Sequence, residues 1–214
     1  MSAVRSASVT LCLLCSLSVA AQPPAVGTPV TRAVLADFEG PGTWRAYERG
    51  EGHGVEAAVS VRPGAPEGVE ASGSASDPAD PVPPQRQVLG VRLRFRELTD
   101  SSVAIEPEKP IPISGGTLWV FEAWASGEGF RHGLYAAFLD SQGLPYAEVL
   151  LGRLDYVGWK HMRAAPPLVH PPGGLLWNGF VLRIDPDSVT AAPQYLYFDL
   201  VTVTLVPDGP GAAP

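Results

Sequence analysis

Four histidines and four carboxylates are the side chains of this sequence best suited to catalysis. The histidines lie far apart and no two have metal-ligand spacing on one element: His53, His132, His161 and His170. Four of the 22 acidic residues could pair across strands as the acid and base of a glycosidase: Glu106, Glu122, Asp140 and Glu148. The sequence has no G-x-S-x-G or H-E-x-x-H motif and no phosphate-binding glycine loop followed by a helix. We therefore predict no catalytic residues and no enzymatic activity.

Carboxylates near the two ends of the chain suggest a metal site. Asp37-Phe38-Glu39 is expected to open the first strand, and Tyr195-Leu196-Tyr197-Phe198-Asp199 lies in the expected last strand. Exported jelly-roll domains commonly pair these two strands, which would bring Asp37 or Glu39 near Asp199. Glu39 and Asp199 are then candidate ligands of a structural Ca²⁺, because Ca²⁺ prefers oxygen ligands. The alternative is that these acids cap strand ends and face water. No other cofactor is predicted.

Three arginines, Arg92, Arg94 and Arg96, alternate with apolar residues and would form a positive ridge on one strand face. Along a strand they would lie about 6.5–7 Å apart. One interpretation is cross-strand pairing with carboxylates, at about 0–1 kcal/mol for each exposed pair. The other is docking against an acidic partner surface, where arginine is enriched at hot spots. The ridge is therefore a candidate interaction site.

The five tryptophans also allow two interpretations: Trp44, Trp119, Trp124, Trp159 and Trp177. Exposed rings would suit a sugar-binding β-sandwich, because a flat ring matches the apolar face of a pyranose. Trp119 and Trp124, however, would point to opposite faces of the most apolar strand, so at least one is expected in the core. Most of the five are predicted to be core residues.

Alternation with a period of two residues indicates the elements that must position these groups. In 88–96, four apolar residues fall on one face and the three arginines on the other. The segment 117–124 is apolar on both faces apart from Glu122, as expected of a central strand. No long helical periodicity is found. The sequence predicts an all-β fold, a β-sandwich, with further strands at 55–62, 133–140, 146–156, 179–185 and 195–206.

The first 21 residues have the pattern of a secretory signal peptide. Arg5 precedes a short apolar core at 9–15 and small residues at 18–21, so cleavage is expected near Ala20 or Ala21. The apolar run is shorter than the about 20 residues of a membrane span. Cys12 and Cys15, the two cysteines, lie in this core, so the exported protein is expected to have no disulfide. It would carry 14 basic and 22 acidic residues, a net charge of −8.

Composition excludes several classes of protein. Glycine and proline, 23 residues each, are too frequent for a helical bundle, and 45% hydrophobic residues are too many for a disordered chain. The acidic balance argues against a nucleic-acid partner. We predict a single β-sandwich domain over 22–206, a long proline-rich loop at about 63–86, and a flexible tail at 207–214.

The order of short motifs resembles the spirochaete flagellar filament outer-layer (sheath) protein family. The most specific run is Gly152-Arg153-Leu154-Asp155-Tyr156-Val157-Gly158-Trp159-Lys160-His161-Met162, followed by Arg183-Ile184-Asp185-Pro186 and the segment ending at Asp199. The signature residues are Gly158, Trp159, Lys160, Asp185, Pro186 and Asp199. Earlier matches are Asp37-Phe38-Glu39, Trp44, Gly90-Val91-Arg92-Leu93-Arg94-Phe95, Ile105-Glu106-Pro107 and His132-Gly133-Leu134.

The resemblance implies a non-enzymatic jelly-roll β-sandwich of the galactose-binding-like type. It also implies a periplasmic location, where the protein would coat or flank the flagellar filament. The chain ends soon after Asp199 and carries the proline-rich insertion, so it would be a short or divergent member. Expected partners are flagellar filament or other sheath proteins, with no membrane span. The alternative is an exported carbohydrate-binding module on the same fold, with a glycan as its partner.

Overall fold

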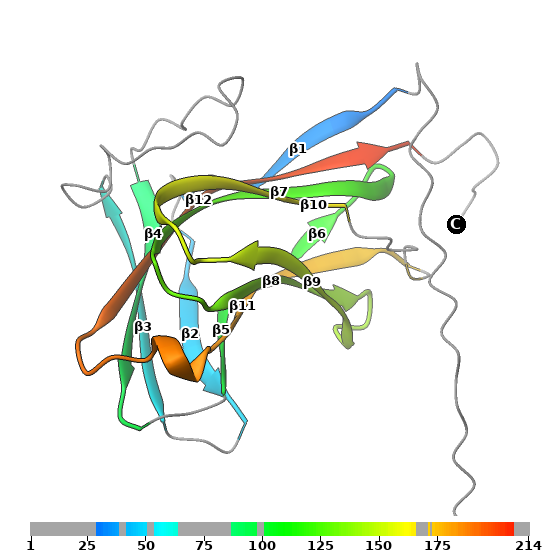
Figure 1. The fold of residues 1–214 in the computed structure, drawn as a ribbon. Coiled ribbons are helices and arrows are strands. Elements are labelled where there is room, and N and C mark those ends of the chain that lie inside the picture. The colour runs from blue at the N-terminus through cyan, green and yellow to red at the C-terminus, as the bar shows by residue number, and fades with distance from the viewer. Residues whose placement is uncertain are drawn as a thin grey trace, which may run out of the picture.

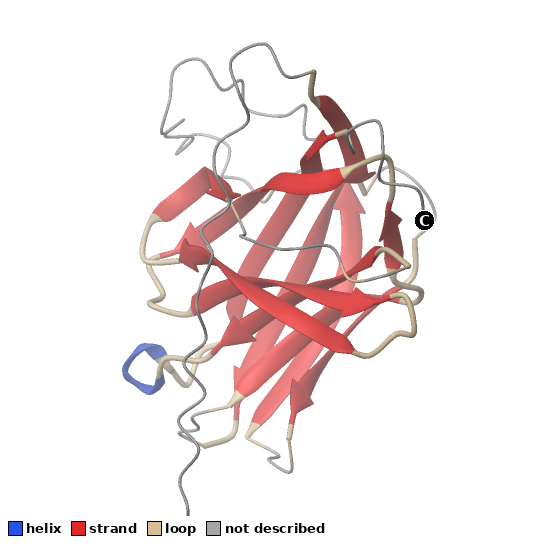
Figure 2. Ribbon diagram, turned by 90° about the vertical axis from the view of Figure 1, so that its right-hand side faces the viewer, coloured by secondary structure: helices blue, strands red, loops and turns tan. Residues whose placement is uncertain are grey.

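The structure is a computed structural model in which two antiparallel sheets pack face to face (Figures 1 and 2). It describes residues 29–38, 42–50, 54–63, 87–97, 101–165, 171 and 173–207. The described part contains twelve strands and one short 3₁₀ turn, η2 (Pro186–Ser188). The predicted all-β sandwich is therefore confirmed.

The first sheet, sheet A, has the strand order β10-β7-β12-β4-β3. β1 pairs with the second half of β12, from Thr31 opposite Leu205 to Ala36 opposite Val201. The predicted pairing of first and last strands is thus confirmed. The strands of sheet A are β10 (Val157–Ala164), β7 (Thr117–Glu128), β12 (Gln194–Val206), β4 (Gln87–Phe95), β3 (Val55–Pro63) and β1 (Thr31–Ala36).

The second sheet, sheet B, has the order β2-β5-β11-β8-β9, and β6 pairs with the first residues of β11. The edge strands β2 and β9 therefore flank a floor made by β5, β11 and β8. The strands of sheet B are β2 (Trp44–Arg49), β5 (Ser102–Pro107), β11 (Leu175–Arg183), β8 (Gly133–Asp140), β9 (Pro145–Arg153) and β6 (Ile111–Ile113).

Aromatic side chains fill the space between the sheets. Phe121 of β7 meets Phe138 of β8 edge to face, with ring centroids 5.6 Å apart, and Trp177 of β11 at 5.7 Å. Phe180 of β11 stacks on Phe198 of β12 at 4.8 Å. Each aromatic pair contributes about 0.5–1.5 kcal/mol beyond the burial of its area. These contacts fix sheet A against sheet B.

Most predicted strands are found, with two corrections. The prediction that Asp37-Phe38-Glu39 opens the first strand is wrong, because β1 is Thr31–Ala36 and ends before Asp37. Phe38 has φ 57°, in the left-handed region, so the extended backbone is interrupted there. The segment 146–156 is also not one strand, because β9 ends at Arg153 and the chain enters β10 at Val157.

Three predicted features lie largely or wholly outside the described residues. They are the signal peptide at 1–21, the proline-rich loop, of which only the first residue belongs to β3, and the tail, of which only Pro207 is described. They stay predictions. In the described ranges, no helix has the length and apolar run that crossing a bilayer demands.

Candidate functional site

The outer face of sheet B is hollowed into a groove of about 370 Å³, which we call the sheet B groove. This volume falls in the range of small-ligand sites, about 300–1,000 Å³. Strands β2, β5, β8, β9 and β11 all contribute to it. Its lining residues are Tyr47, Arg49, Glu106, Ala137, Phe138, Leu139, Pro145, Tyr146, Ala147, Glu148, Asn178 and Val181.

Two tyrosines on the edge strands flank the groove. Tyr47 of β2 is 42% exposed and Tyr146 of β9 is 39% exposed. The floor between them includes small side chains, because Ala104 lies opposite both Tyr47 and Val181 in the strand register. Ala137 of β8 continues this floor. The groove thus has aromatic sides and an apolar floor.

A β-bulge directs Asn178 toward the groove. Trp177 pairs with Phe138 and Phe180 with Ala136, so Asn178 and Gly179 together face a single residue of β8. Such an extra residue reorients a side chain relative to the ladder. Gly179 has φ +90°, and a Cβ there would lie 2.1 Å from the carbonyl oxygen of Ile105. Only glycine fits this close approach, and the bulge depends on it.

Glu106 anchors one part of the groove. Its carboxylate forms an ion pair with Arg45 at 2.9 Å and accepts a hydrogen bond from Asn178 Nδ2 at 2.9 Å. Burial, together with a hydrogen bond and the charge of Glu106, raises the pKa of Tyr47. Tyr47 therefore stays a neutral phenol, and Glu106 is a carboxylate with fixed neighbours.

Glu148 anchors the other part. Its carboxylate pairs with Arg49 and, at 3.0 Å, with Arg183. Arg183 also lies over the ring of Tyr135, 4.3 Å from its centroid. Burial alone would raise the pKa of Glu148, but the hydrogen bonds and charges of the two arginines outweigh burial and lower it. Glu148 is therefore an ionised acceptor at neutral pH.

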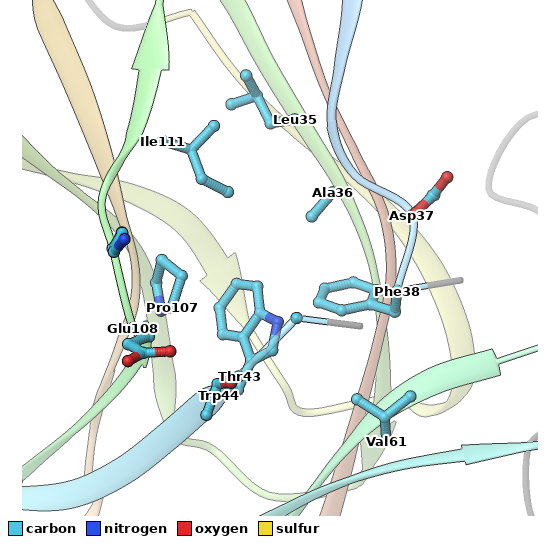
Figure 3. Close-up of a pocket in the computed structure, with 12 residues that line it drawn as sticks. Leu35, Ala36, Asp37, Phe38, Thr43, Trp44, Val61, Pro107, Glu108 and Ile111 are labelled. Atoms are coloured by element: carbon cyan, nitrogen blue, oxygen red, sulfur yellow. The ribbon is translucent and has the colours of Figure 1, made fainter. Parts of the chain in front are cut away.

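A second cavity, of about 450 Å³, lies where the end of β1 meets the start of β2 (Figure 3). Trp44 stands between Phe38, 5.3 Å away by ring centroids, and the side of the cavity formed by Pro107 and Ile111. The carboxylate of Asp37 points away from these rings. The cavity is mainly apolar and offers packing surface rather than an arrangement of reacting groups.

The four carboxylates considered as catalytic candidates are each held by local partners. Glu106 and Glu148 are engaged by arginines in the sheet B groove. Glu122, only 5% exposed, pairs with Arg163 at 2.9 Å and Arg32 at 3.2 Å. Asp140 accepts hydrogen bonds from the backbone of the turn after β8. These contacts give the four carboxylates structural roles.

The arginine ridge lies on the outer face of β4, beside edge strand β3. Glu56 of β3 stands opposite Arg94 in the register and pairs with Arg92 at 3.9 Å and Arg96 at 3.7 Å. Cross-strand pairing is thus present, but one carboxylate pairs with two of the three guanidinium groups. The ridge keeps a net positive charge.

The metal-site residues do not assemble into a cluster in the described part of the chain. Asp199 is buried, and its Oδ1 accepts a hydrogen bond from the backbone of Leu200 at 2.7 Å. Glu39 lies outside the described residues. Within those residues, no group of three or more His, Cys, Asp or Glu side chains is arranged to hold a metal ion. The calcium site stays a prediction.

Signature residues around β10 have identifiable structural roles. Gly158 has φ 91°, which favours glycine at this position. Trp159 is buried against Trp124 and Tyr197 on the outer face of sheet A. The ammonium of Lys160 lies 5.1 Å from the centroid of the Tyr156 ring, a cation–π contact.

Asp185 and Pro186 are connected to His132. The backbone N–H of Asp185 donates to His132 Nδ1 at 3.1 Å, and His132 Nε2 lies 2.7 Å from Gln194 Oε1. Asp185 Oδ1 also accepts from the backbone N–H of Asp187, which caps the 3₁₀ turn that begins at Pro186. These residues hold the turn between β11 and β12.

Most of the tryptophans are core residues, as predicted. Trp124, Trp159 and Trp177 are buried, whereas Trp44 and Trp119 are half-buried. The exposed aromatic residues of the sheet B groove are the tyrosines Tyr47 and Tyr146, which the sequence analysis did not identify. Arg45, Tyr47 and Arg49 alternate with Trp44, Ala46 and Glu48, and this period-two pattern is the signal that marks the exposed face of β2.

Comparison with known proteins gives one family and several structures. No curated protein sequence matches the chain. The family model for the flagellar filament outer layer protein Flaa matches residues 74–174, a stretch that contains β4 to β10. This stretch includes Gly158, Trp159 and Lys160, whereas Asp185, Pro186 and Asp199 lie beyond it.

Similar solved structures include carbohydrate-binding modules and a phage domain. A family 11 carbohydrate-binding module from Clostridium thermocellum, solved with a β-1,3-1,4-mixed-linked tetrasaccharide, is 13% identical. The match covers 80% of this chain and 94% of that one, at a TM-score of 0.46.

The module TmCBM61, solved with β-1,4-galactotriose, is 15% identical at a TM-score of 0.40, over 79% of this chain and 90% of that one. The enzymatically active domain of bacteriophage CBA120 tailspike protein 4 is 14% identical at a TM-score of 0.44. That match covers 79% of this chain and 20% of the phage chain. The match of residues 74–174 supports the resemblance to the flagellar filament outer layer proteins that the sequence motifs indicate.

Proposed function

We propose that this protein is a non-catalytic structural subunit of the flagellar outer layer in a spirochaete periplasm. The observation that carries this proposal is the family match over residues 74–174, which contains seven of the twelve strands. The subunit would associate with filament or other outer-layer proteins through its strand edges and its arginine ridge.

The arginine ridge is the first contact candidate. Arg94 is exposed, and Arg92 and Arg96 share Glu56 at distances that leave both guanidinium groups accessible. Exposed ion pairs of this kind contribute only about 0–1 kcal/mol. An acidic partner surface can therefore displace Glu56 at little cost, and arginine is favoured at such contacts.

Sedimentation with purified filaments tests this contact. The protein should pellet with the filaments, and Arg92→Ser, Arg94→Ser and Arg96→Ser combined should reduce the pelleted fraction several-fold without lowering the thermal midpoint appreciably. Arg153→Ser is the control, because Arg153 is an exposed arginine on edge strand β9 of the other sheet. Equal pelleting of the triple variant and the unmodified protein would remove the ridge from the interface.

Export is part of the proposal. A periplasmic subunit requires removal of the predicted leader, so the protein isolated from cells should begin near Ala21 or Gln22. Mass spectrometry of its N-terminal peptide tests this. A mature protein that retains Met1 would contradict it.

A second candidate function is carbohydrate binding on the same fold. It is favoured by the exposed rings of Tyr47 and Tyr146 on either side of one groove. Tryptophan platforms do not support it, because three of the five tryptophans are buried and two are half-buried. The two functions are compatible, since the sheet B groove and the arginine ridge lie on different sheets.

A further inference from the structure

We propose that the sheet B groove binds a neutral oligosaccharide, with Tyr47 and Tyr146 as stacking rings and Glu106 and Asn178 as hydrogen-bonding groups. The proposal rests on the second candidate function and specifies its residues and its ligand class. It does not require the protein to be attached to a filament.

The aromatic sides of the groove provide the stacking surface. Tyr47 and Tyr146 come from strands at opposite edges of sheet B and both line the same cavity. A tyrosine ring offers a flat apolar face for stacking, and its hydroxyl can remain hydrogen-bonded to water when a sugar is bound. Two such rings can contact successive units of a saccharide chain that lies along the groove.

The floor of the groove allows the close approach of a sugar ring. Ala137 and Val181 line the groove between the tyrosines, and Ala104 lies next to Val181 in the register. Longer side chains stand beside this floor, because Tyr135 lies opposite Val181 in the register and Arg49 and Arg183 meet at Glu148. A pyranose can pack on the small side chains of the floor while its edge hydroxyls face these polar groups.

Fixed polar groups provide the hydrogen bonds. Glu106 is held by Arg45 and Asn178, and Glu148 is held by Arg49 and Arg183. Each carboxylate has more acceptor sites than these bonds use, so it can accept a further bond from a sugar hydroxyl. Because the side chains are already oriented, binding costs little of their conformational entropy.

The charge of the lining indicates a neutral ligand. Glu106 and Glu148 line the groove, and their charges are taken up by ion pairs with Arg45, Arg49 and Arg183. A sugar carboxylate placed between the tyrosines would have to compete for arginines that are already paired with these two carboxylates. A neutral saccharide needs no such competition, which distinguishes it from a uronic acid chain.

A glycan array followed by calorimetry tests the proposal with the full exported chain. The array carries neutral hexasaccharides of glucose, mannose and galactose in several linkages, together with hexagalacturonate and an extended heptapeptide. We expect saturable binding of at least one neutral hexasaccharide and a weaker response to hexagalacturonate and to the peptide.

Substitutions locate the binding in the groove. Tyr47→Ala and Tyr146→Ala should each weaken binding of the best neutral hexasaccharide by at least tenfold, whereas Tyr47→Phe and Tyr146→Phe should keep it within about threefold. Leu150→Ala is the matched control, because Leu150 is 52% exposed on the same strand as Tyr146 but does not line the groove. Thermal unfolding checks that every variant is folded.

The outcomes separate this inference from the broader function. Binding of a neutral hexasaccharide that survives both alanine substitutions in folded protein would overturn the groove assignment while keeping a glycan function. Preference for hexagalacturonate or for the peptide would overturn the ligand class. A blank array would overturn the inference and the second candidate function together, and would leave the filament role untouched.

Discussion

Arg49 of β2 and Glu148 of β9 form an ion pair, although their strands lie at opposite edges of sheet B. Four strand spacings separate these edges, roughly 19 Å in a flat sheet. That span exceeds the combined reach of the two side chains, so the sheet must curve over its outer face. Arg183 of the central strand β11 pairs with the same carboxylate at 3.0 Å. One carboxylate thus connects an edge strand and the middle of the sheet, and the sheet B groove owes its depth to this curvature.

The first prediction concerns the strength of this connection. Arg49→Ala and Glu148→Ala should each lower the free energy of unfolding, and a double-mutant cycle should give a coupling of about 0.5 kcal/mol, because both groups are partly exposed. Urea denaturation measures it. Arg153→Ala is the control, since Arg153 is exposed on β9 and forms no ion pair within the described ranges. A coupling of zero would mean that the ion pair does not hold the edges together.

The second prediction follows from the lowered pKa of Glu148. In the unfolded chain this carboxyl has its ordinary pKa of 4.5, so the unfolded state binds the proton at higher pH than the folded state does. The stabilisation is therefore fully present above pH 4.5 and is lost as pH falls through the lower, folded pKa. The difference in unfolding free energy between the unmodified protein and Glu148→Gln should shrink on acidification. A difference independent of pH between 6 and 3 would contradict it.

The third prediction concerns His132, which is fully buried between Asp185 and Gln194. Burial lowers its pKa below the ordinary 6.5, and this effect outweighs the hydrogen bond to Gln194 and the charge of Asp185. Nδ1 accepts from a backbone N–H, so the neutral ring carries its proton on Nε2 and donates to Gln194. The stability that the neutral ring supports is present above pH 6.5 and is lost as pH falls through its folded pKa.

Nuclear magnetic resonance of the ring nitrogens checks this assignment. His132 should titrate below pH 6.5, with the Nε2–H tautomer at neutral pH. His132→Ala should lower the free energy of unfolding by about 1–3 kcal/mol, because Gln194 loses a buried partner. A ring that titrates at or above pH 6.5 would show that it is more solvated than the structure indicates.

The fourth prediction concerns the bulge glycine. Gly179→Ala should destabilise the protein by about 2 kcal/mol or more, because φ +90° is strained for alanine and its Cβ would clash with the carbonyl of Ile105. Gly143→Ala is the matched control. Its φ is +80° and nothing lies within 4 Å of an added Cβ, so only about 1 kcal/mol is expected. Equal effects of the two substitutions would mean that the bulge adapts to a side chain.

The sheets could be predicted from the sequence where alternation is strict. Leu89, Val91 and Leu93 are buried in β4, and Arg94 on the opposite face is exposed, as the pattern indicates. Short strands are harder to predict from the sequence. β6 has only three residues, one of which is proline, and β1 precedes the acidic motif that was interpreted as its start. Such strands are specified by their partners, Trp177 and Leu205 among them, rather than by their own pattern.

The candidate site could be predicted only in part. The arginine ridge could be predicted from the alternation of a single strand, and the structure places Arg94 on the exposed face of β4 as expected. The sheet B groove, in contrast, depends on long-range contacts. Arg49 and Glu148 are 99 residues apart, and Glu106 and Asn178 are 72 apart. Asn178 reaches Glu106 only because of the bulge at Gly179, which no alternation pattern contains. Tertiary curvature and register, not local sequence, assemble this site.

The most direct test of the central claim is quantitative mass spectrometry of flagella purified from the native cell. The account predicts that the protein is enriched in the flagellar fraction over the soluble periplasmic fraction and is present in a constant ratio to the filament proteins. A protein found wholly in the soluble fraction, and absent from purified flagella, would contradict the account.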